Sequence, residues 1–188
     1  MPSKYVRFDE VEDVLSSLGL LALCAPLVRE ETSYWKWAII SAHAALQGAM
    51  VCALHDTSGL SVLDKQSARG MREWFDKKIE TPPNEKLAHF NTLLRRCCES
   101  KSMRGEPLAL SQAQLKDIKL LHDHFRNSFA HFVPQSWSIE KAGLPRIVGA
   151  AVDVTERLMA YPNVVHKLSG NKKRRFESYL GTIRTQLG

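Results

Sequence analysis

Three polar side chains stand close together in the stretch 125–132: Arg126, Asn127 and His131. The arginine is a permanent planar cation that fits a phosphate group, and the histidine can exchange a proton near neutral pH. The amide of Asn127 can orient either group by hydrogen bonds. A fixed cation, a polar orienter and a proton carrier are the groups that phosphodiester chemistry without a metal requires.

The apolar spacing of the surrounding residues predicts that this stretch ends a long amphipathic helix. Ile118, Leu121 and Phe125 fall on one arc with Phe129 and Phe132, which we expect to face the core. In a regular α-helix, Arg126 and His131 would point about 140° apart. The two side chains would then not converge on one substrate atom. Either the last turn unwinds before Pro134, or another chain completes the site.

Each of the three residues also has a purely structural interpretation. Arg126 could pair with Asp123 or cap carbonyl groups at the helix end. His131 could complement the helix dipole, and Asn127 could simply be solvated. The spacing alone leaves these alternatives open.

The chain has 188 residues, a formal net charge of +6 and a pI near 9.2, which indicates an anionic partner. The charge is concentrated in residues 163–188, where Glu177 is the only acidic residue. One interpretation is a solvated last helix. The other is a phosphate-binding patch made by four consecutive cations: Lys172, Lys173, Arg174 and Arg175.

The remaining composition favours a cytoplasmic protein without cofactor or metal. The four cysteines form no CxxC pair and are expected to be reduced thiols. Residues 1–12 are charged and lack the apolar stretch of a signal peptide. The apolar run 37–54 contains His43 and Gln47 and falls short of a comfortable membrane span, so we expect a buried core helix.

Helical periodicity extends along the whole chain, and no convincing strand pattern occurs. We therefore predict one all-α domain spanning residues 1–188, an up-and-down bundle of six to seven helices. Pro26 is expected to end the first helix, while Pro145 should mark a kink or a helix start nearer Leu144. Leu23, Phe75, Ile79 and Leu87 are among the residues expected to face inward. The expected helices cover residues 9–25, 31–55, 66–79, 84–100, 111–132, 138–161 and 172–187.

The motif resembles that of the HEPN superfamily, in which an arginine and a polar residue are followed, after a short spacer, by histidine. Here Asn127 follows Arg126, and the spacer to His131 comprises residues 127–130. The wider stretch to Glu140 is similar to one bacterial branch of HEPN-like proteins. The resemblance covers about 20 residues and implies a HEPN-like helical bundle that dimerises through the motif face.

The resemblance also implies an activity, because catalytic HEPN proteins are metal-independent ribonucleases, often toxins or antiphage effectors. By this analogy Arg126 would hold the phosphate of an RNA substrate, His131 would act as general acid and base, and Asn127 would orient them. An antitoxin or another regulatory protein is an expected partner, and a membrane is not. The alternatives are a non-catalytic dimeric module that binds RNA, a nucleotide or a protein, and a purely structural dimer.

Overall fold

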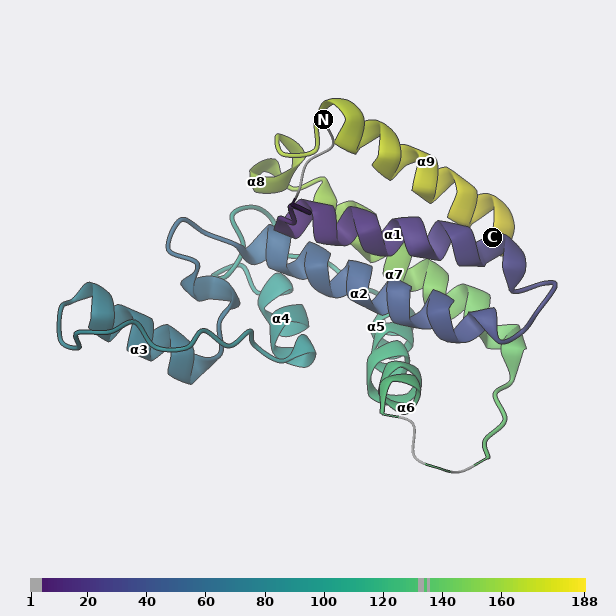
Figure 1. Cartoon of the computed structure of the whole chain (residues 1–188), viewed down its shortest axis with the longest axis horizontal. Helices are drawn as coiled ribbons and strands as arrows, with labels where there is room; N and C mark the ends of the chain where they lie inside the picture. The colour runs from purple at the N-terminus through teal and green to yellow at the C-terminus, as the bar shows by residue number, and fades with distance from the viewer. Residues whose placement is uncertain (1–4, 132–133, 135) are drawn as a thin grey trace.

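The computed structural model describes residues 5–131, 134 and 136–188, and within these ranges the chain is all-helical with no strand (Figure 1). This confirms the predicted all-α class, but the described chain has more helices than the six to seven predicted. Phe132, expected in the core stripe, lies outside the described residues, as do residues 1–4 of the charged N-terminus. The elements are α1 (Glu10–Leu27), α2 (Tyr34–Leu54), η1 (Leu60–Val62), α3 (Lys65–Phe75), α4 (Phe90–Cys97), α5 (Gln112–Lys119), η2 (Leu120–Arg126), α6 (Asn127–Ala130), η3 (Lys141–Gly143), α7 (Leu144–Met159), α8 (Pro162–Val165) and α9 (Gly170–Leu187).

Helix α2 is the centre of the fold, because it packs against α1, α4, α7 and the segments η2 and α6. Helix α9 lies along α1 (Figure 1). By length and composition alone α2 could cross a membrane, but 72% of its most apolar window is buried inside the protein. Its small residues permit close approach. A Cβ atom at Gly48 would lie 2.9 Å from Cγ2 of Val14 in α1. The expectation of a buried core helix is therefore confirmed.

The motif helix is one continuous run of α5, η2 and α6, and it begins at the predicted cap. The Ser111 hydroxyl accepts from the Gln114 backbone N–H, and the Gln114 side chain accepts from the Ser111 N–H, which forms a capping box. The seven residues of η2 form a π-helix rather than a regular α-helix. The predicted 100° steps therefore do not hold over residues 120–126, which lead up to Asn127, since a π-helix has a wider turn.

Several predicted helix boundaries were wrong. Pro26 lies inside α1, which continues to Leu27. The fourth helix begins at Phe90, and not at residue 84, because the preceding residues are extended and bond to another segment. The N–H of Asp64 donates to the Lys86 carbonyl at 2.8 Å, and the N–H of Ala88 donates to the Val62 carbonyl at 2.9 Å.

Several predicted inward positions were also wrong, because these side chains are exposed: Leu23, Phe75, Ile79 and Leu87. Leu23 is 69% exposed and lies on the outer surface of α1, while Ile79 falls beyond the end of α3. Pro145 occupies the first turn of α7, where its missing N–H costs no helical hydrogen bond. The predicted start near Leu144 is therefore confirmed, and the alternative of a kink is not.

Candidate functional site

Arg126 ends the π-helix and borders a cavity of about 580 Å³ between the motif helix, the middle of α2 and the beginning of α1. Its Nη1 donates a hydrogen bond to Oδ1 of Asn127 at 3.0 Å. In the described part of the chain it forms no ion pair, neither with Asp123 nor with another carboxylate. The half-buried guanidinium is thus held by a neutral amide, and no carboxylate of the described residues pairs with its charge.

His131 lies where the helix ends, on the surface. Its backbone N–H bonds the Asn127 carbonyl at 2.9 Å, while its side chain is exposed and has no polar partner among the described residues. His131 does not border the cavity that Arg126 lines. One chain thus brings Arg126 and Asn127 together and leaves His131 outside. The position of His131 also fits the alternative role of complementing the helix dipole.

A pair of histidines that the motif did not indicate lies next to Arg126. Nε2 of His43, in α2, is 2.8 Å from Nδ1 of His122, in η2. Both rings stack with the Phe90 ring, with centroid distances of 4.6 Å and 4.2 Å. His43 is thus a buried histidine of the central helix with a hydrogen-bond partner. Its partner could not be found by spacing, because the two residues are 79 positions apart.

Burial, followed by the proximity of His122 and Arg126, lowers the pKa of His43 to about 3. Burial also lowers the pKa of His122. Both imidazoles are therefore neutral at pH 7, and one ring donates the shared proton to the other. The carboxylate of Asp123 lies 3.9 Å from Nε2 of His122 and accepts a hydrogen bond from Asn91 at 3.2 Å. Because both rings are neutral, Arg126 carries the positive charge beside them.

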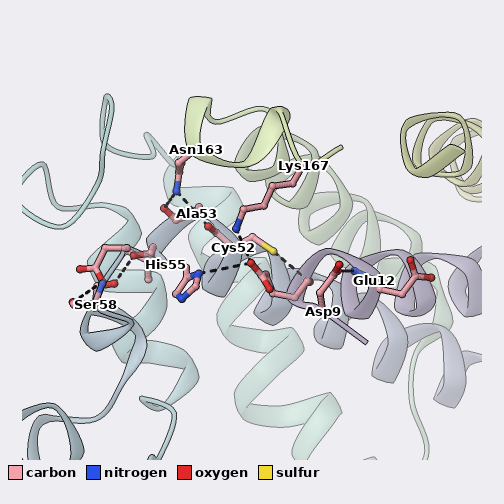
Figure 2. A network of polar contacts seen from close by, with 12 residues as sticks. Asp9, Glu12, Cys52, Ala53, His55, Ser58, Asn163 and Lys167 are labelled. Carbon is pink, nitrogen blue, oxygen red and sulfur yellow. Dashed lines mark hydrogen bonds and ion pairs between the residues drawn. The ribbon is translucent and has the colours of Figure 1, made fainter. Parts of the chain in front are cut away.

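The beginning of α1 forms another border of the Arg126 cavity, and polar contacts connect it to other elements (Figure 2). Nζ of Lys167 lies 2.7 Å from Oε1 of Glu10, and Nδ1 of His55 lies 3.7 Å from the same oxygen. The thiol of Cys52 donates to the Glu10 carbonyl at 3.3 Å. The hydrogen bond from Lys167 is the main reason why the pKa of Glu10 is lowered. Glu10 therefore stays ionised, and its negative charge is paired with the positive charge of Lys167.

The basic segment at the beginning of α9 lies against this same part of α1. Lys172 pairs with Asp9 at 2.6 Å, and Arg175 pairs with Glu12 at 2.7 Å. Lys173 is 3.9 Å from Glu177, and Arg174 forms no ion pair within the ranges that the structure describes. Lys173 and Arg174 are both exposed. They therefore have more free charge than Lys172 and Arg175 for an external anion.

A larger cavity of about 1080 Å³ lies between α5, α7 and the end of α9. Asp117 and Arg146 border it and form an ion pair, in which Arg146 donates to Oδ2 of the buried aspartate. No residue of the predicted motif borders this cavity. The candidate site is therefore the smaller cavity at Arg126.

Comparisons with family models, with curated proteins and with solved structures found no match for this chain. The resemblance to the HEPN superfamily therefore depends on the motif residues, and it enters the proposal below on their geometry. The geometry provides an arginine open to a cavity, an amide that holds it, a neutral histidine pair beside it and an exposed histidine at the helix end.

Proposed function

We propose that this protein is a metal-independent endoribonuclease of the HEPN type that acts as a homodimer, in a toxin or antiphage role. The observation that carries the proposal is the guanidinium of Arg126. It borders a cavity, and its only side-chain partner in the described chain is the amide of Asn127. A cation held in place but not neutralised is suited to bind a phosphate.

RNA carries its own nucleophile, the 2′-hydroxyl group. An imidazole removes the proton of this hydroxyl, the 2′-oxygen forms a bond to phosphorus, and the bond from phosphorus to the 5′-oxygen breaks. The imidazolium formed in this way delivers a proton to the leaving 5′-oxygen, and Arg126 stabilises the charge on the phosphoryl oxygens. The products carry 2′,3′-cyclic phosphate and 5′-hydroxyl ends, and no metal is consumed or required.

A homodimer supplies what one chain lacks. His131 is exposed at the end of the motif helix and lies outside its own Arg126 cavity. Around a two-fold axis the same face meets its copy, so each motif is present twice. His131 of the partner subunit then reaches the cavity of the first chain. An antitoxin that covers this face would block both sites.

The exposed cations of α9 extend the surface that an RNA strand would follow. Lys172 bonds Asp9, and Asp9 borders the Arg126 cavity, so the basic segment continues from the rim of that cavity. Lys173 and Arg174 would bind phosphates next to the scissile one, which makes binding dependent on salt. Lys172 and Arg175 contribute less net charge, since each is paired with a carboxylate of α1.

The test incubates purified protein with total RNA in EDTA and compares the wild type with the variants Arg126→Ala and His131→Ala. Loss of either group should slow cleavage about 100-fold or more, which corresponds to about 3 kcal/mol in the barrier. Arg126→Lys keeps the charge but loses the planar fork, so it should recover only part of the activity. His166→Ala, which removes an exposed histidine of the α8 end, is the control.

A second candidate function is a non-catalytic dimeric module that binds RNA, a nucleotide or a protein. The separation of His131 from the Arg126 cavity within one chain favours it. Such a module would bind labelled RNA, lose binding in Arg126→Ala and cleave nothing. Cleavage by His131→Ala at the wild-type rate would also contradict the catalytic proposal. Growth arrest on expression of the wild type that is relieved by His131→Ala would support the catalytic proposal.

A further inference from the structure

The cavity at Arg126 contains a second charge that the proposed reaction does not use. Asp13 borders the same cavity, and its carboxylate forms no hydrogen bond or ion pair within the described chain. Burial alone raises the pKa of this carboxyl group, and no cation contributes to the shift. Asp13 and Arg126 are thus opposite charges that border one cavity without pairing with each other.

The other acidic residues at this cavity are already neutralised. Asp9 is paired with Lys172, and Glu10 is paired with Lys167. Asp13 is therefore the carboxylate that remains for a ligand. Its Oδ2 lies over α2, where a Cβ atom added to Gly48 would approach it to 3.0 Å. The glycine, which has no side chain, gives this oxygen room against the central helix.

The walls of the cavity have the character of a site for a flat ring. Phe8, which is 63% exposed, and Leu87, which is 41% exposed, border it from outside the helices. Gln47 also borders it, and its amide has no hydrogen-bond partner among the described residues. The volume of about 580 Å³ falls in the range of about 300 to 1,000 Å³ that small organic ligands occupy.

We propose that this cavity binds a guanine base, the base of the nucleotide that carries the scissile 3′-phosphate. Asp13 accepts hydrogen bonds from N1–H and N2–H of guanine, Arg126 binds the phosphate, and Phe8 stacks on the base. The amide of Gln47 can donate to O6. This inference rests on the proposed ribonuclease function and adds to it a substrate preference, which is cleavage after guanosine.

The two oxygens of a carboxylate distinguish guanine from the other bases. Guanine presents two adjacent N–H donors on one edge, which match two acceptors. Adenine and cytosine present one amino donor beside a ring nitrogen that accepts, and uracil presents one N–H between two carbonyls. In each of these three cases a carboxylate oxygen would face another acceptor and remain unsatisfied in a partly desolvated site.

The first experiment measures equilibrium binding of guanosine, adenosine, cytidine and uridine 3′-monophosphates by calorimetry. Guanosine 3′-monophosphate should bind the wild type at least about tenfold more tightly than the others, since a bidentate pair to a base discriminates by that factor or more. Asp13→Asn, which replaces one acceptor with a donor, should abolish the preference. Asp13→Ala serves as a second variant, and Glu12→Gln, a carboxylate of the same helix outside the cavity, should keep it.

The second experiment follows cleavage in EDTA of four DNA oligonucleotides, each with a single ribonucleotide of a different base. The wild type should cleave after the guanine ribonucleotide, and Asp13→Asn should cleave all four alike. Equal binding of the four monophosphates, or a guanine preference that survives in Asp13→Asn, overturns the inference. Selective binding without any cleavage would instead overturn the ribonuclease proposal while leaving the guanine site in place.

Discussion

The buried pair His43–His122 makes the stability of the protein depend on pH between about 3 and 6.5. The pKa of His43 falls from 6.5 to about 3 in the folded chain, because burial, His122 and Arg126 all disfavour its charged form. Over this range the unfolded chain binds a proton that the folded chain does not. The free energy of unfolding therefore decreases as the pH falls below 6.5, by about 1.4 kcal/mol per pH unit from this group alone.

Between pH 7 and pH 5 the loss due to His43 is about 2 kcal/mol, since most of the unfolded imidazole becomes protonated over this interval. The variant His43→Gln removes the titrating group and retains an amide that can bond His122. Its free energy of unfolding should therefore fall by about 2 kcal/mol less than that of the wild type over the same interval.

The assay is urea denaturation followed by circular dichroism at both pH values. His166→Gln, which removes an exposed histidine, should behave like the wild type. Carboxylates titrate equally in all three proteins and cancel in the comparison. If His43→Gln and the wild type lose the same stability from pH 7 to pH 5, then His43 is not held neutral, and the account of the pair is wrong.

Two further substitutions test how the motif helix and α2 are held in place. Ser111→Ala removes the capping box of α5 and should lower the free energy of unfolding by about 1 kcal/mol, measured by urea denaturation, whereas Ser111→Asp should retain the cap. Gly48→Ala places a methyl group 2.9 Å from Val14 and 3.0 Å from Asp13, so it should cost about 1 to 3 kcal/mol in a thermal melt. Gly181→Ala, with no atom within 4 Å of the added carbon, is its control; equal melting of the two variants would contradict the close packing of α1 on α2.

Sequence periodicity predicted the helices whose apolar faces are continuous, and it failed where tertiary contacts decide the backbone. Residues 84–89 follow two prolines and contain helix-forming residues, so a helix was expected there. Instead Lys86 and Ala88 bond the segment around Leu63, a partner that local sequence does not reveal. Pro26 was expected to end α1, but it stands in the last turn, where a missing N–H removes only one hydrogen bond.

In the candidate site, too, local spacing predicted part of the arrangement, and contacts between distant segments were not predicted. The spacing of Arg126 and Asn127 identified a pair that is in contact in the structure. The π-helix was not predicted, because the apolar spacing of residues 120–126 also fits a regular α-helix. Local spacing also could not reveal that Arg126 faces a cavity shared with α1, or that His122 meets His43, since these contacts join segments far apart in the sequence.

The placement of Arg126 and His131 on different surfaces leads to a test of how the dimer builds its site. If the arginine of one chain acts with His131 of the partner subunit, a dimer of one Arg126→Ala chain and one His131→Ala chain keeps one intact site. Two inactive variants mixed at random should then recover about a quarter of the wild-type activity, because half of the dimers are mixed and each has one of two sites. Co-expression with two different tags isolates the mixed dimer, which should reach about half. If both groups act within one chain, each site of the mixed dimer lacks one group, and its activity stays at the level of the single variants. That outcome would mean that the helix end must rearrange within its own chain, and the composite site would be wrong.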